Sequence, residues 1–155
     1  MEQSLFDSPE FTPAVQSATF FRPKFKLEEF LVGCDPLERN NLSLTVFSNI
    51  FRLVQIMSVI RIQANMPITI TSGYRSFRHN MRVNGVKNSQ HLTGSACDFK
   101  TYAPDRIHQL VPWIRDNIEF GQLIEYDNFL HISLPNAGKV CEYIDKRTQS
   151  HRNPY

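Results

Sequence analysis

The clearest hydrophobic pattern in this chain of 155 residues is a helical one over residues 44–64. Apolar side chains recur there at the spacing of one helix face: Val46, Phe47, Ile50, Phe51, Val54, Met57 and Ile60. Ser43 directly precedes the run, and serine is a favoured N-cap residue. We therefore expect a long amphipathic helix whose methionine and phenylalanine side chains belong to the core rather than to a ligand site.

Alternating apolar and polar positions predict strands in the rest of the chain. Residues 68–71 alternate, and two further strand-like runs, 122–126 and 129–134, flank Asp127-Asn128, which favours a tight hairpin. The segment from Val140 predicts one more short strand. Helical patterns are weaker at residues 26–31, at 77–83, and at 105–118, where Pro112 favours a kink or a late start. This mixture predicts an α+β fold, with a small antiparallel sheet packed against helices.

Length and composition indicate a single globular domain, because 41% of the residues are hydrophobic and 21% are charged. We expect an N-terminal arm over residues 1–23, a domain over 24–145 and a loose, polar tail over 146–155. The net charge of +2 is too small to indicate nucleic acid by itself. We expect no nucleic-acid partner, no membrane span and a monomer. Three cysteines without a CxxC pair argue against a disulfide framework or a thiolate zinc site.

The segment from Ser89 to Asp98 carries the most informative polar residues. His91 and Asp98 are seven positions apart, which corresponds to about 10.5 Å along a helix or roughly 23 Å in an extended chain. Neither distance allows both side chains to bind one ion. The chain must therefore fold back between them, and Gly94 tolerates the backbone angles of such a turn.

A third candidate ligand, His131, lies in the strand-like run 129–134. Two imidazoles and one carboxylate suit a zinc ion whose fourth position is left to water, as in catalytic zinc sites. By strand parity, Glu125 and Asp127 are expected on the side of His131 if the strand continues that far. Spacing alone leaves a structural role for each histidine open.

Four motifs follow one another along the chain: residues 72–76 (Ser-Gly-Tyr-Arg-Ser), 83–85 (Val-Asn-Gly), 89–98 (Ser-x-His-x-x-Gly-x-Ala-x-Asp) and 129–133 (Phe-Leu-His-Ile-Ser). Together they resemble the zinc D-alanyl-D-alanine carboxypeptidase family, whose fold is shared with Hedgehog domains. The likeness extends from about Phe25 to Leu134 and is greatest to the short forms of bacteriophages and mobile elements; phage endolysins that cut peptidoglycan peptides share the fold. The resemblance implies a zinc metallopeptidase, a hydrolase that acts on peptidoglycan peptides of the bacterial cell wall.

The resemblance also implies roles for individual residues. His91, Asp98 and His131 would bind Zn²⁺, Arg75 would face the substrate carbonyl or a carboxylate, and Ser89 would help to bind substrate, with Tyr74 as a further substrate-site candidate. Many relatives carry a carboxylate general base three residues before the last histidine, where this chain has Asn128. Glu125 is the favoured alternative base and Asp127 the second.

Two other functional classes remain open. The first is a zinc-containing module that binds the cell wall or a protein without catalysis; Asn128, at the common position of the general base, supports it. The second is nucleic-acid binding, which rests only on scattered arginines. The first residues lack a basic segment followed by an apolar run, so we expect no secretory signal. The protein is expected to be made in the bacterial cytoplasm and to reach the wall by release or export, or as part of a virion.

Overall fold

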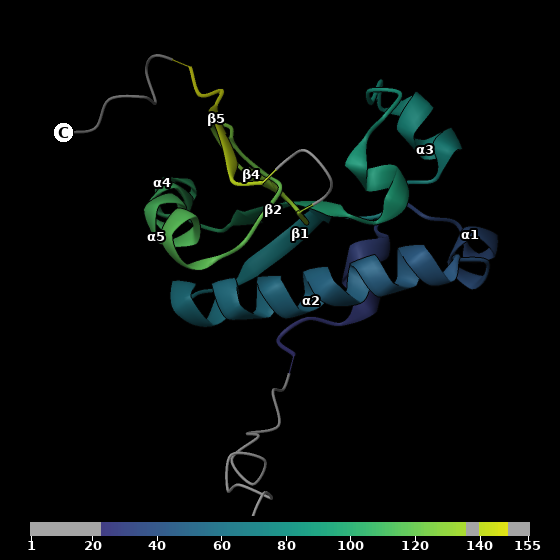
Figure 1. The fold of residues 1–155 in the computed structure, drawn as a ribbon, viewed down its shortest axis with the longest axis horizontal. Helices are drawn as coiled ribbons and strands as arrows, with labels where there is room; N and C mark the ends of the chain where they lie inside the picture. Colours follow the sequence, from purple (N-terminus) through teal and green to yellow (C-terminus); the bar gives the residue numbers. More distant parts are fainter. Residues whose placement is uncertain (1–22, 136–139, 149–155) are drawn as a thin grey trace, which may run out of the picture.

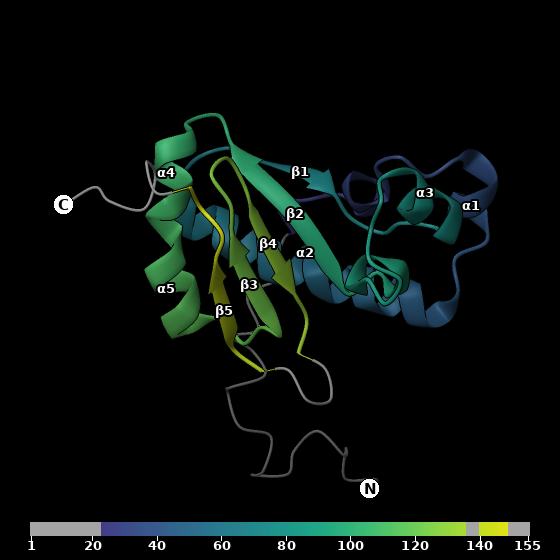
Figure 2. The same cartoon turned by 90° about the horizontal axis from the view of Figure 1, so that it is seen from above.

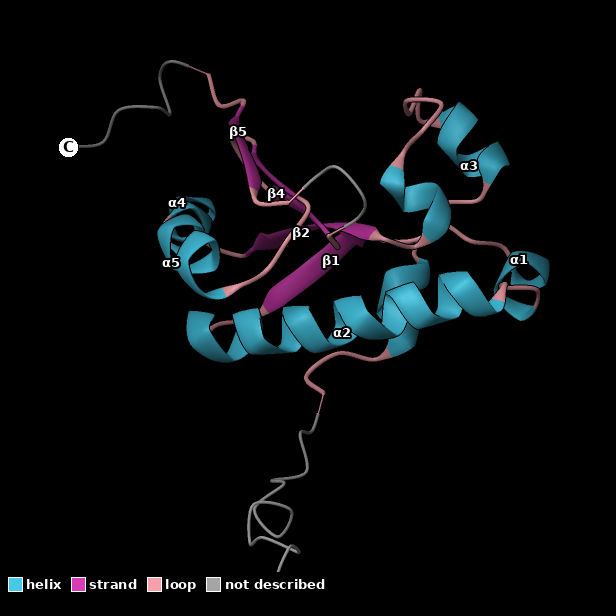
Figure 3. Cartoon of the chain, in the orientation of Figure 1, coloured by secondary structure: helices cyan, strands magenta, loops and turns pink. Residues whose placement is uncertain are grey.

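The computed structural model describes residues 23–135 and 140–148. Figure 3 shows the mixture of helices and strands, which confirms the α+β class. In chain order, the elements are η2 (Leu27–Leu31), α1 (Pro36–Asn40), α2 (Leu44–Ala64), β1 (Ile68–Ser72), α3 (Phe77–Arg82), η3 (Gln90–Thr93), β2 (Ala96–Thr101), α4 (Pro104–His108), α5 (Leu110–Asn117), β3 (Gln122–Glu125), β4 (Leu130–Ser133) and β5 (Glu142–Asp145). The expected N-terminal arm, apart from Pro23, and the tail beyond Thr148 lie outside the described residues.

Helix α2 has the predicted bounds, and it lies below the sheet in Figure 1. The Ser43 hydroxyl accepts a hydrogen bond from the amide of Val46 at 3.2 Å, as an N-cap should. The prediction that Phe47 and Phe51 are buried is wrong: they are 46% and 48% exposed, because the core lies against the adjacent face that carries Ile50. By length and composition alone α2 could cross a membrane, but a core helix passes the same test, and its inner face is buried in the domain.

The five strands form one sheet in the order β1-β2-β4-β3-β5 (Figure 2). The pairs β1 with β2, β2 with β4, and β4 with β3 are antiparallel, as predicted. Strand β5 instead pairs in parallel with β3, so the sheet is mixed rather than antiparallel. The reason is that the chain after β4 returns to the end of the sheet where β3 begins: the amide of Cys141 donates to the carbonyl of Phe120 at 2.7 Å.

The helical pattern predicted over residues 105–118 forms two helices, α4 and α5, that meet at Gln109. Pro112 has no amide hydrogen and therefore cannot continue a helical hydrogen-bond ladder from α4. It lies instead in the first turn of α5, where such a hydrogen bond is not required. Helix α4 begins before the predicted range: its N-cap is Ala103, and Asp105 lies within its first turn.

The two faces of the sheet have different environments. Buried side chains of the strands, among them Phe99, Leu123 and Leu130, share one core with apolar residues of α2, α4 and α5. The opposite face, which carries Asp98 and His131, lines a cavity. The sheet thus separates a core shared with α2, α4 and α5 from the cavity that Asp98 and His131 line.

Candidate metal centre

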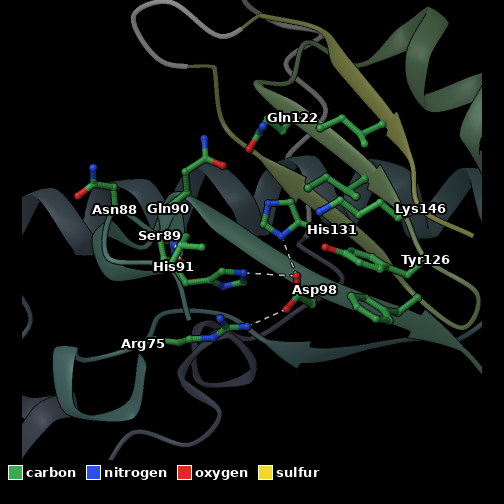
Figure 4. Close-up of a pocket in the computed structure, with 14 residues that line it drawn as sticks. Arg75, Asn88, Ser89, Gln90, His91, Asp98, Gln122, Tyr126, His131 and Lys146 are labelled. Carbon is green, nitrogen blue, oxygen red and sulfur yellow. Dashed lines mark hydrogen bonds and ion pairs between the residues drawn. The ribbon is translucent and has the colours of Figure 1, made fainter. Parts of the chain in front are cut away.

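His91, Asp98 and His131 converge from three separate elements, η3, β2 and β4 (Figure 4). Their ligand atoms all lie within 4.8 Å of one another, so the group can hold a metal ion. Asp98 Oδ1 is 3.3 Å from His91 Nε2 and 2.7 Å from His131 Nδ1. Asp98 and His131 are directly paired across β2 and β4, and this register fixes two of the three donors on the same face.

The chain reverses between His91 and Asp98 at Gly94, as the spacing predicts. Gly94 has φ +67°, and its amide donates to the carbonyls of Gln90 and His91. A β-carbon at this position would lie 3.1 Å from side-chain atoms of Val46 and Ile50 on α2. Both the left-handed backbone and the close packing against α2 favour glycine here.

A backbone carbonyl fixes the orientation of the His91 ring. His91 Nδ1 lies 2.7 Å from the carbonyl oxygen of Gly73, and because a carbonyl only accepts, Nδ1 carries the proton. In the neutral ring the lone pair of His91 is therefore on Nε2, the atom that can bind a metal ion, whereas in the protonated ring Nε2 donates to Asp98 Oδ1, 3.3 Å away. Gly73 can take this position only without a side chain, since a β-carbon there would lie 2.1 Å from the carbonyl oxygen of Phe30.

Arg75 contacts the second oxygen of the Asp98 carboxylate. Its Nη2 lies 2.9 Å from Asp98 Oδ2, and its Nε donates to Ser72 Oγ at 2.8 Å. Burial raises the pKa of Asp98, but the hydrogen bonds from His131 and His91 outweigh burial and hold this pKa well below its usual range. Asp98 is therefore a carboxylate at neutral pH, the form that binds a metal ion.

The three candidate ligands open into a cavity of about 740 Å³. Arg75 and Ser89 line it, so these two predicted substrate-site residues lie beside the metal centre. The other residues that line it are Val86, Asn88, Gln90, Gln122, Ile124, Tyr126, Phe129, Ile144 and Lys146. Tyr74 is not among them: its side chain packs against the hydrophobic core, which corrects its assignment to the substrate site.

Glu125 does not face the cavity, contrary to the prediction of a general base. Its side chain is 3% exposed on the opposite face of the sheet, where Oε1 lies 2.7 Å from His108 Nδ1 and 3.3 Å from Arg147 Nη1. Its Oε2 accepts a hydrogen bond from the hydroxyl of Tyr143. His108 of α4 is thus a partner of a buried carboxylate.

The register of the hairpin explains this correction. Ile124, not Glu125, pairs with His131, so residues of opposite parity share a face across the turn. Parity along one strand does not carry through a hairpin, because the pairing register decides which residues face together. Asp127 is also absent from the cavity lining; its Oδ1 accepts from the amide of Thr148 at 2.7 Å.

The sequence patterns missed several residues that line the cavity. Gln90 is adjacent to a ligand, and within the described residues its buried Nε2 has no hydrogen-bond partner. Tyr126 and Phe129 stack on each other with ring centroids 4.3 Å apart. Gln90 could have been found from its position beside His91, whereas Lys146 reaches the cavity only because β5 pairs with β3.

Comparison with protein families gives one match that covers most of the domain. The model of the peptidase M15 family, described as "Peptidase M15", matches residues 23–133. The chain belongs to this family. The match includes His91, Asp98, His131 and Arg75, and it ends before β5. No curated protein matches the chain.

Membership in the M15 family confirms the resemblance to the zinc D-alanyl-D-alanine carboxypeptidases. It supports a peptidase type of function, and M15 peptidases are typically metal-dependent. The convergent His91, Asp98 and His131 agree with this requirement, since the structure brings together three donors of the kinds that bind metal ions.

Proposed function

We propose that this protein is a zinc-dependent peptidase that hydrolyses peptidoglycan stem peptides, at D-Ala-D-Ala or another bond involving a D-residue. The observation that carries the proposal is the convergence of His91, Asp98 and His131 at the wall of an open cavity. Two nitrogen donors and one oxygen donor suit Zn²⁺ and leave a coordination position for water or substrate. The carbonyl that orients His91 and the guanidinium on Asp98 complete the surroundings of the ligands.

The side chains of the cavity have complementary roles in this proposal. A bound zinc ion would supply Lewis acidity and lower the pKa of a coordinated water. Arg75 would stabilise the negative charge that develops on the carbonyl oxygen of the scissile bond. Ser89 would donate to or accept from the peptide backbone of the substrate, and Gln90 Nε2, which has no hydrogen-bond partner among the described residues, would donate to it.

The charge of the cavity favours a second candidate, a zinc-containing module that binds peptidoglycan or a protein without cleaving it. Among the described residues that line the cavity, Asp98 is the only carboxylate. Glu125 lies behind the sheet, Asp127 contacts Thr148, and Asn128 is exposed at the hairpin turn. Removal of a proton from water is therefore not assigned to Glu125 or Asp127.

The biological setting is part of the proposal. A short, phage-type M15 peptidase would be made in the bacterial cytoplasm and would act on the wall after release or export, or as part of a virion. The peptide substrate would be its partner, with no nucleic-acid or membrane partner and a monomeric state. These expectations rest on the sequence resemblance and on the modest net charge.

Digestion of defined muropeptides, followed by mass spectrometry, tests the proposed peptidase. We expect cleavage that stops with a chelator and returns with zinc. His91→Ala or Asp98→Ala should abolish both zinc binding and cleavage, because each removes one of three ligands, whereas the exposed Asp105→Ala should change neither. Stoichiometric zinc with full activity in either ligand variant contradicts the site. Zinc binding without any product supports the binding module.

A further inference from the structure

The cavity has a second cation, Lys146, on the other side of the metal centre from Arg75 (Figure 4). Lys146 directly follows β5, outside the part of the chain that matches the family model. Its Nζ lies 5.6 Å from the centroid of the Tyr126 ring, which is stacked on Phe129. The ammonium group is thus held over an aromatic face that is itself part of the cavity wall.

Lys146 gives the cavity an excess of positive charge. Arg75 and Lys146 are the arginine and lysine among the described lining residues, and Asp98 is the carboxylate. Arg75 is paired with Asp98, whereas the ion pairs of the described residues do not include Lys146. A divalent ion on the ligands would increase the excess. Such a charge attracts an anionic group of the ligand to the Lys146 side of the cavity.

The buried network around Glu125 holds the segment that presents Lys146. Alternate residues of this segment face opposite sides: Ile144 and Lys146 line the cavity, while Tyr143 and Arg147 contact Glu125 behind the sheet. The amide of Lys146 also donates to the carbonyl of Glu125 at 2.8 Å. The backbone of Lys146 is therefore fixed from behind, and its flexible side chain can reach the ligand.

We propose that Lys146 binds a carboxylate of the peptide substrate and so determines specificity. This inference rests on the proposed function, because it takes a stem peptide as the occupant of the cavity. A stem peptide with L-lysine at its third position offers two carboxylates, one at the C-terminus and one on the D-glutamyl residue. The Lys146 ammonium acts as a mobile point charge toward either, while Arg75 remains bound to Asp98.

The test compares peptides that differ only in one carboxylate. The first pair is acylated L-Lys-D-Ala-D-Ala with a free or an amidated C-terminus, and the second is a stem peptide with D-isoglutamate or D-isoglutamine. Zinc-loaded protein is assayed by calorimetric binding for uncleaved peptides, and by kcat and KM for cleaved ones. The variants are Lys146→Met, Lys146→Arg and, as the matched control, Lys100→Met, an exposed lysine of β2 outside the cavity lining.

We expect wild type to prefer the carboxylate member of one pair about tenfold, equivalent to about 1.4 kcal/mol. Lys146→Met should lose this preference through KM rather than kcat, Lys146→Arg should keep part of it, and Lys100→Met should keep all of it. The responding pair identifies the carboxylate. A wild type without preference, or an unchanged preference in Lys146→Met, overturns the inference. Binding preference that needs Lys146, without cleavage, instead overturns only the peptidase proposal.

Discussion

The substitution Glu125→Gln separates a structural carboxylate from a general base. In the structure, the Glu125 carboxylate accepts from Tyr143 and contacts His108 and Arg147, with a side chain that is only 3% exposed. Glutamine has the same shape, but an NH₂ group replaces one carboxylate oxygen. This hydrogen-bond donor then faces another donor, such as the Tyr143 hydroxyl or the Arg147 guanidinium. Hydrogen bonds to charged groups contribute about 1.5–3 kcal/mol, so we expect a loss of about 2–3 kcal/mol in the free energy of unfolding.

For a chain of this length, such a loss lowers the midpoint of thermal unfolding by about 4–12 °C. Circular dichroism measures this midpoint, and the exposed Glu119→Gln, another isosteric change, should leave it nearly unchanged. Zinc content should remain stoichiometric, and activity should fall less than tenfold. A general base accelerates a reaction about 10²–10⁴-fold. A loss of activity of that size, with unchanged thermal stability and zinc content, would refute the structural role of Glu125.

Two further predictions concern the Gly73 carbonyl that orients His91 and the hydrogen bond from Tyr143 to Glu125. Gly73→Ala should weaken zinc binding about 10–100-fold in a competition titration, because the new methyl group displaces the carbonyl that orients His91; unchanged affinity would contradict this orientation. Burial and then the hydrogen bond to a buried carboxylate raise the pKa of Tyr143 to about 12. Since this pKa is higher than in the unfolded chain, the contribution to stability is complete below about pH 10 and falls toward pH 12. Tyr143→Phe should therefore flatten the decline of stability between pH 10 and pH 12 in urea unfolding, and equal slopes for both proteins would count against it.

Local patterns in the sequence determined much of the secondary structure. Ser43 and the apolar spacing after it gave both ends of α2, and Asp127-Asn128 gave the hairpin between β3 and β4. Both predictions hold because capping and turn formation depend on residues a few positions apart. The chain reversal at Gly94 was predicted because His91 and Asp98 are too far apart in a helix or a strand to bind one ion. This feature, too, depends on residues close together in the sequence.

The sequence by itself also predicted the candidate ligands His91, Asp98 and His131, since donor types and a required turn are visible along the chain. Only the tertiary structure decided which side chains share the cavity with them. The pairing of Ile124 with His131 placed Glu125 behind the sheet, and a shift of register by one residue would have reversed this outcome. The parallel pairing of β5 brought Lys146 to the cavity from beyond the matched motifs. Register and strand order depend on contacts between residues far apart in the chain, which no local pattern contains.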